Sequence, residues 1–151
     1  MFKQSAGILL YRKINNQLQL FLVHPGGPFF KNKDNGAWSI PKGEFLNDED
    51  PLTAAKREFT EETGYFIDGN FILLNPIRLK SGKKVYAWAI EGNVDHEVIV
   101  SNLFTIEWPT KSGKKQNFPE IDKAGWFDIE TARKKINSGQ LEFINELLTL
   151  I

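Results

Sequence analysis

The feature that most constrains this chain is the segment of residues 43–65, GEFLNDEDPLTAAKREFTEETGY, because it contains a helix whose two ends are both marked. Asp50 is a favourable N-cap residue, and the proline that follows it, Pro51, suits the first helical position. Gly64 suits the end of the helix, since glycine adopts the left-handed conformation that often follows the last turn. The sequence therefore predicts a helix that begins at Pro51 and ends before Gly64.

The predicted helix has an apolar face and, beside it, an acidic face. At about 100° per residue, one arc carries the residues that we expect in the core: Leu52, Ala55, Phe59 and Thr63. The adjacent arc carries three glutamates: Glu58, Glu61 and Glu62. The small Ala54 lies one turn earlier in the same sector and leaves room beside them. Two residues are expected to point to solvent: Lys56 and Thr60.

Three neighbouring carboxylates call for a partner of opposite charge. Like charges three or four residues apart destabilise an isolated helix by about 0.2–0.5 kcal/mol per pair. A solvated acidic face with an ion pair between Arg57 and Glu61 is one explanation, but it leaves the fixed positions of Gly43, Glu49 and Gly64 unexplained. A hard divalent cation such as Mg²⁺ or Mn²⁺ is the other explanation, since these ions prefer oxygen ligands.

The spacing of glycines, glutamates and arginine in this segment resembles the signature of the Nudix hydrolases. That signature reads Gly, five residues, Glu, seven residues, then Arg-Glu-apolar-any-Glu-Glu-any-Gly-apolar. The positions that match it are Gly43, Glu49, Arg57, Glu58, Phe59, Glu61, Glu62, Gly64 and Tyr65. Tyr65 is a mild departure, because the last apolar position of the signature is usually aliphatic.

The resemblance implies a fold, a cofactor and a reaction. The fold is an αβα sandwich of the α/β (α+β) class, in which a mixed sheet is flanked by the signature helix and a C-terminal helix. The cofactor is Mg²⁺ or Mn²⁺, with four implied ligands: Glu58, Glu61, Glu62 and the carbonyl of Gly43. Arg57 and Glu49 would orient these glutamates. The reaction is hydrolysis of a nucleoside diphosphate linked to a further group, for which the ions neutralise phosphate charge and activate water.

Residues 38–43, WSIPKG, bear on the substrate. They resemble the W-x-x-P-K-G of the branch that acts on dinucleoside polyphosphates and diphosphoinositol polyphosphates. Lys42 is therefore a candidate to bind a phosphate as a point charge, and a surface lysine in a turn is the alternative. Trp38 is either a core residue or part of the site. Three aromatic residues are candidates to stack on a base: Tyr86, Phe29 and Phe30.

Glu120 is the second position that bears on the chemistry. It precedes a Trp-Phe pair at a spacing similar to that of a glutamate in the dinucleoside tetraphosphate hydrolases. We therefore expect Glu120 to be an additional metal ligand or the general base, against the alternative of a plain loop acid. The polar, lysine-containing segment of residues 109–119 before it is expected to be a loop that stays mobile until substrate arrives.

The rest of the chain predicts one α/β domain over residues 1–151. Apolar runs separated by turn residues predict strands at 5–12, 18–24, 37–40, 71–80, 84–91, 103–108 and 124–128. Helical spacing is predicted at 129–136 and 139–150. Strands dominate, with helices in the middle and at the end, which favours a sandwich over a helical bundle.

The composition excludes several classes of function. The chain has no cysteine, which excludes disulfides, thiolate nucleophiles and Cys-ligated zinc. Lys plus Arg equals Asp plus Glu, at 19 each, so no overall field favours nucleic acid or a membrane. No apolar run approaches the ~20 residues that span a bilayer, and residues 1–5 lack the apolar stretch of a signal peptide. We therefore expect a cytoplasmic protein without a membrane or nucleic-acid partner. The resemblance implies a small-molecule nucleotide as the substrate, and we expect a monomer or homodimer.

More than one function fits these residues. The leading hypothesis is a metal-dependent pyrophosphohydrolase of dinucleoside polyphosphates or related nucleotides. A hydrolase that removes oxidised nucleoside triphosphates is an alternative of the same class. A nucleotide sensor without catalysis is less favoured, since degenerate sensors usually lose signature carboxylates that this chain keeps. Processing of RNA 5′ ends is disfavoured by the even charge balance.

Overall fold

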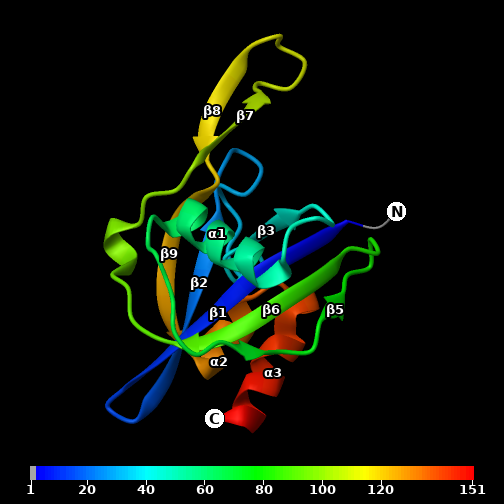
Figure 1. The fold of residues 1–151 in the computed structure, drawn as a ribbon. Coiled ribbons are helices and arrows are strands. Elements are labelled where there is room, and N and C mark those ends of the chain that lie inside the picture. The colour runs from blue at the N-terminus through cyan, green and yellow to red at the C-terminus, as the bar shows by residue number, and fades with distance from the viewer. Residues whose placement is uncertain (1–2) are drawn as a thin grey trace.

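The computed structural model describes residues 3–151, which form a mixed β-sheet with helices on both faces (Figure 1). Helix α1 (Pro51–Thr63) covers one face of the sheet. Helices α2 (Ile129–Lys135) and α3 (Leu141–Leu150) cover the opposite face. The predicted αβα sandwich, with a mixed sheet between the signature helix and a C-terminal helix, is confirmed.

The sheet is built around β1 (Gln4–Ile14), which has neighbours on both sides. β1 runs parallel to β6 (Lys84–Glu91) and antiparallel to β2 (Gln17–Pro25) and β3 (Lys42–Phe45). β9 (Ile121–Asp128) pairs antiparallel with β2. β1 is buried over most of its length, because helices cover both faces of the sheet.

Helix α1 contacts the sheet through the face that the sequence predicts, with one change. Ala55, Phe59 and Thr63 are fully buried. Leu52, predicted in the same face, is only partly buried, whereas Ala54 is fully buried and packs in the core. The buried face is therefore shifted toward the acidic arc of the helix, and the glutamates of that arc lie nearer to the sheet than the sequence suggests.

Lys56 and Thr60 are the residues of α1 that the sequence directs to solvent. Thr60 is exposed. Lys56 is instead partly buried, because its Nζ lies 3.2 Å from an Asp68 oxygen and 5.3 Å from the centre of the Phe71 ring. The prediction for Lys56 is wrong because the segment after the helix folds back along it, which helical periodicity cannot show.

The predicted strand at residues 37–40 does not form. This segment makes only isolated bridges, one to Val23 and one to Ile136. The regular strand here is β3, which starts at Lys42, immediately after Pro41. Proline lacks the N–H that a continuous ladder needs, so the chain pairs regularly only beyond it.

The predicted strand at residues 71–80 is broken. It forms two short strands, β4 (Ile72–Leu73) and β5 (Ile77–Arg78), and both pair with β6. The break falls at Asn75 and Pro76. Pro76 has no N–H, and the N–H of Asn75 donates to a glutamate side chain of α3. Neither residue therefore contributes a ladder hydrogen bond.

A separate two-stranded hairpin replaces the predicted mobile loop. β7 (Leu103–Glu107) pairs antiparallel with β8 (Lys115–Pro119), and the hairpin projects away from the sandwich (Figure 1). The prediction for residues 109–119 is thus wrong from Lys115 onward. β8 was missed because its sequence, KQNFP, is mostly polar and is exposed over its first three residues.

The remaining elements are short. Two 3₁₀ helices are present, η1 (His96–Val98) and η2 (Ser138–Gln140), and η2 leads directly into α3. Within residues 3–151, no helix has the length and apolar character needed to cross a membrane. The signal-peptide prediction concerns residues 1–5, of which Met1 and Phe2 lie outside the described residues.

Candidate functional site

Helix α1 is fixed at both ends by the residues that the sequence marks. The side chain of Asp50 accepts a hydrogen bond from the N–H of Thr53 at 3.0 Å. The N–H of Gly64 donates to the carbonyl of Thr60 at 2.7 Å, with φ of 81° at the glycine. A side chain at Gly64 would be strained by this φ and would press on Val100. The caps therefore set which residues face the site.

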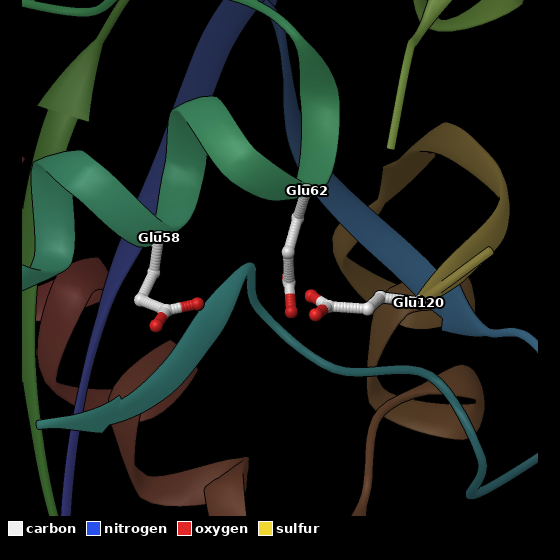
Figure 2. A group of neighbouring side chains, drawn as sticks. All are labelled: Glu58, Glu62 and Glu120. Carbon is white, nitrogen blue, oxygen red and sulfur yellow. The ribbon is translucent and has the colours of Figure 1, made fainter. Parts of the chain in front are cut away.

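Three glutamates meet beside α1, as Figure 2 shows. Glu58 and Glu62 lie one turn apart on α1, and Glu120 reaches them from another part of the chain. Each offers a carboxylate oxygen, and these oxygens lie within 4.8 Å of one another. Glu58 and Glu62 are each only 8% exposed. The fold thus concentrates negative charge where water is largely excluded.

Glu120 lies between β8 and β9, far from α1 in sequence. Its N–H donates to the carbonyl of Asn102 at 2.8 Å, and its own carbonyl accepts from the N–H of Gly26 at 2.8 Å. A Cβ on Gly26 would overlap the carbonyl of Pro119, so only glycine allows this close approach. The backbone at Glu120 is therefore held on both sides, and its carboxylate is directed at the two glutamates of α1.

Arg57 organises the acidic residues next to this group. It binds Glu49 through two hydrogen bonds of 2.9 Å, one from Nε and one from Nη2. Its Nη1 donates to Glu58 at 2.9 Å and to Glu61 at 3.1 Å. Among the described residues, the group of three converging carboxylates does not include Glu61. Arg57 therefore links Glu61 to the group without bringing its carboxylate into it.

The proximity of the carboxylates and their burial raise their pKa values. Burial, followed by the charge of Glu58, raises the pKa of Glu62 to about 8. Burial, followed by the charge of Glu61, raises the pKa of Glu58 to about 7, against the opposing effect of Arg57. The pKa of Glu120 is also raised, by burial and then by Glu61. Negative charge at this place is thus costly for the chain alone.

Gly43 and Lys42 line the other side of the group. A Cβ on Gly43 would overlap the carboxylate of Glu58, so only glycine lets this carboxylate approach the backbone so closely. The backbone N–H of Lys42 donates to Glu62 at 3.2 Å. A cavity of about 140 Å³ is lined by Lys42, Glu62 and Glu120, together with apolar neighbours. Burial, and then the charge of Lys83, lowers the pKa of the Lys42 ammonium.

Trp38 is a core residue. It is only 5% exposed, and its ring meets that of Phe127 edge to face at 5.0 Å between centroids. Its Nε1 donates to Asp34 at 2.8 Å. The tryptophan thus anchors the segment that leads to Lys42.

The sequence analysis missed the residues that hold the loop beside Glu120. The buried ring of His24 lies 2.8 Å from an Asp122 oxygen at Nδ1 and 2.7 Å from the carbonyl oxygen of Lys33 at Nε2. Asp122 follows Glu120 by two residues, so this contact also supports the position of Glu120. No spacing in the sequence marks the contact between His24 and Asp122, because it joins residues 98 positions apart.

The fold and the site together define an α/β sandwich protein with a cluster of three carboxylates between helix α1 and the adjoining loops. The NUDIX domain family model matches residues 1–147. The chain therefore belongs to the NUDIX domain family, and the sequence resemblance is confirmed.

Two curated proteins of Saccharomyces cerevisiae are similar to the chain. They are mRNA-decapping enzyme subunit 2 of strain YJM789 and m7GpppN-mRNA hydrolase of strain S288c. Each is 28% identical over 153 residues, which cover 97% of this chain but only 13% of the yeast protein. The chain thus spans a small part of the length of these relatives.

Solved structures share the fold. A Caenorhabditis elegans Ap4A hydrolase in a binary complex has a TM-score of 0.67 at 20% identity, over 97% of this chain and 96% of that one. The NUDIX domain of Shewanella oneidensis NrtR, complexed with ADP ribose, has a TM-score of 0.68 at 14% identity, over 99% and 88%. At these identities the two structures show that the fold is shared.

Proposed function

We propose that the chain is a metal-dependent pyrophosphohydrolase that cleaves a phosphoanhydride bond in a nucleoside diphosphate linked to a further group. A dinucleoside polyphosphate is the leading substrate class. The observation that carries the proposal is the group formed by Glu58, Glu62 and Glu120, whose oxygens lie within 4.8 Å of one another. Buried carboxylates are costly unless they are neutralised, and phosphoanhydride hydrolysis uses cations that do so.

The residues present fit Mg²⁺ or Mn²⁺. Both ions prefer oxygen ligands, and Mg²⁺ is usually held by one or two carboxylates together with water and substrate phosphates. Glu58, Glu62 and Glu120 would hold the ions, and Glu61 and the carbonyl of Gly43 are further candidate ligands. The close approach of the Glu58 carboxylate to Gly43, which a Cβ would prevent, supports this fit because it brings the Glu58 oxygens beside the Gly43 backbone. When bound, the ions neutralise phosphate charge and activate the attacking water.

Glu120 is the candidate for a second role as general base. Its pKa is raised by burial and by Glu61, which makes it a better proton acceptor than an ordinary carboxylate. It is also the member of the group that comes from outside α1, so it can take a proton while the glutamates of α1 hold metal. Arg57 acts by orienting Glu58 through the hydrogen bond from Nη1.

Lys42 supports a substrate with several phosphates. Lys42 lines the same cavity as Glu62 and Glu120, and the charge of Glu62 acts on its ammonium. An ammonium next to the metal-binding carboxylates can bind a phosphate that the metals do not reach. The C. elegans protein of similar fold is named as an Ap4A hydrolase, which agrees with a dinucleoside polyphosphate.

A second candidate function is cleavage at the 5′ end of RNA. The observation that favours it is the similarity to yeast proteins named for mRNA decapping, over 97% of this chain. The even charge of the chain, 19 basic and 19 acidic residues, argues against a nucleic-acid substrate. A hydrolase of oxidised nucleoside triphosphates and a non-catalytic nucleotide-binding module are further alternatives.

One panel separates these functions. The protein is incubated with Mg²⁺ and diadenosine tetraphosphate, ADP-ribose, an oxidised nucleoside triphosphate or a capped RNA oligonucleotide, and the products are resolved by chromatography. We expect the dinucleotide to be cleaved with the highest kcat/KM, and all cleavage to stop in excess chelator. Preference for the capped RNA or the oxidised triphosphate would replace the leading substrate class. Binding without any cleavage would instead identify a sensor.

A further inference from the structure

Residues 26–33 form a loop after β2 that is fixed to the rest of the fold at both ends. Near its start, the N–H of Gly26 donates to the carbonyl of Glu120 at 2.8 Å. Its end is joined to the buried His24, whose Nε2 lies 2.7 Å from the carbonyl oxygen of Lys33. The loop is therefore held in a fixed position relative to Glu120.

The middle of the loop meets the β7–β8 hairpin through aromatic rings. Phe104 of β7 packs against Gly27, where a Cβ would lie 2.8 Å from its ring. Phe29 and Trp108 lie edge to face, with centroids 5.4 Å apart and an interplanar angle of 78°. Phe29 nevertheless remains 60% exposed. The pair thus leaves aromatic surface open on an otherwise anchored loop.

The aromatic pair and the carboxylate group lie toward opposite ends of the hairpin. The N–H of Trp108 donates to the carbonyl of Lys114, next to the start of β8, whereas Glu120 follows the end of β8. Five steps of about 3.3–3.4 Å each lead from Lys115, along β8, to Glu120, a span of about 17 Å. A ligand that touches both places must be extended, as a nucleoside with a chain of phosphates is.

The charge around the aromatic pair suits a phosphate chain. The loop and the end of the hairpin carry exposed lysines: Lys31, Lys33, Lys111, Lys114 and Lys115. The acidic residues of these segments have partners. Asp34 accepts from the Lys135 ammonium at 2.6 Å, and Glu107 accepts from the N–H of Lys111 at 2.8 Å. The local excess of charge is therefore positive, although the whole chain is neutral.

The other aromatic candidates for base stacking already have neighbours on their rings. Tyr86 stacks on Trp88 with centroids 6.5 Å apart and meets Phe45 at 6.0 Å. Phe30 has the ammonium of Lys33 5.4 Å from its ring centre. Phe29 and Trp108 are thus the pair that combines open ring surface with an anchored position.

We propose that Phe29 and Trp108 form the nucleobase platform of this site. The base stacks on these rings, and the phosphates run back along the hairpin to Glu58, Glu62 and Glu120. The inference rests on the proposed function and deepens it, because it names the element that selects a substrate with a base over a bare polyphosphate. It also assigns the β7–β8 hairpin a part in substrate recognition.

The test is equilibrium binding of diadenosine tetraphosphate and of inorganic tripolyphosphate, with Ca²⁺ as the cation and the integrity of the dinucleotide checked by chromatography. Phe29→Ala and Trp108→Ala are expected to weaken dinucleotide binding about 5- to 150-fold, the range for loss of one stacked base. Tripolyphosphate, which has no base, is expected to bind within about twofold of wild type. Phe66→Ala is the matched control, since Phe66 is 79% exposed and lies outside the loop and the hairpin.

Two conservative variants separate stacking from packing. Binding is also followed by the quenching of tryptophan fluorescence that a stacked base causes. Trp108→Phe is expected to keep dinucleotide affinity but to lose most of this quenching. Phe29→Leu is expected to weaken affinity, although its apolar volume is similar. Wild-type affinity in all Phe29 and Trp108 variants, or equal weakening for both ligands, would overturn the platform. If the alanine variants do not fold by circular dichroism, the conservative pair alone decides. A dinucleotide that binds with these losses but is not cleaved in Mg²⁺ supports the platform and refutes the hydrolase.

Discussion

Replacing Glu62 by glutamine tests whether the cluster of three carboxylates, those of Glu58, Glu62 and Glu120, destabilises the metal-free protein. Burial, and then the charge of Glu58, raises the pKa of Glu62 from 4.5 to about 8, so the folded protein binds this proton more tightly than the unfolded chain. Between these two pH values, the folded state holds a proton that the unfolded state has lost. The free energy of unfolding therefore falls as the pH rises through this window. Glutamine keeps an oxygen that can accept from the N–H of Lys42 but carries no charge.

The magnitude follows from the pKa change. One pKa unit corresponds to about 1.4 kcal/mol, so a rise from 4.5 to about 8 corresponds to about 5 kcal/mol. Besides burial, part of this rise comes from the charge of Glu58, so protonation of Glu58 reduces it. We expect Glu62→Gln to raise the free energy of unfolding by about 2–4 kcal/mol at pH 8, and by about 1 kcal/mol or less at pH 5.

The assay is urea unfolding followed by circular dichroism at a series of pH values, in the presence of chelator. Glu97→Gln is the control, because the Glu97 side chain is 78% exposed. Addition of Mg²⁺ at pH 8 is expected to raise the stability of wild type more than that of the variant. A stability difference that does not change with pH, or a variant less stable than wild type at pH 8, would refute the reasoning.

Three further predictions concern activity. Glu58→Gln is expected to abolish turnover without a change in the circular dichroism spectrum. Excess chelator is expected to abolish turnover of the wild-type protein. Full turnover in either case would contradict the metal site. Lys42→Ala is expected to raise KM or lower kcat more for long polyphosphates than for short diphosphates. Steady-state kinetics with substrates of increasing phosphate chain length measure this difference. Equal effects at all chain lengths would exclude the proposed role of Lys42. If Glu120 is the general base, Glu120→Gln is expected to lower kcat by about 10²–10⁴-fold with little change in KM. Partial rescue of the variant by high Mg²⁺ would instead identify Glu120 as a metal ligand. Rates within about twofold of wild type would identify it as a loop acid without a catalytic role.

The helix that carries the site was predictable because its signals are local. Asp50, Pro51 and Gly64 each act through contacts within a few residues, and α1 spans Pro51–Thr63 as these residues predict. The one-turn separation of Glu58 and Glu62 also follows from helical geometry alone. The resemblance to a known family added the mixed sheet between helices, which the periodicity of single strands does not define.

The parts that could not be predicted depend on contacts between distant segments. β8 has no apolar alternation, so only its partner β7 shows that it is a strand. Glu61 lies in the same predicted arc as Glu58 and Glu62, but its carboxylate is bound by Arg57 rather than directed into the group. Whether a glutamate of the arc pairs with Arg57 or points into the group depends on the three-dimensional positions of the side chains. The helical arc gives only the direction in which each residue leaves the helix.

The position of Glu120 links the fold to the chemistry. The glutamates of α1 are carried by a helix whose buried residues, such as Phe59, hold it on the sheet, so the helix cannot move away without loss of core packing. Glu120 is held independently, by hydrogen bonds to Gly26 and Asn102. Burial, and then the charge of a neighbouring glutamate, raises the pKa values of Glu58, Glu62 and Glu120. The backbone holds the three residues at this place, so the cost of negative charge here is built into the fold. A divalent cation relieves it directly, which is why we expect the least stable form of this protein at alkaline pH to be the metal-free one.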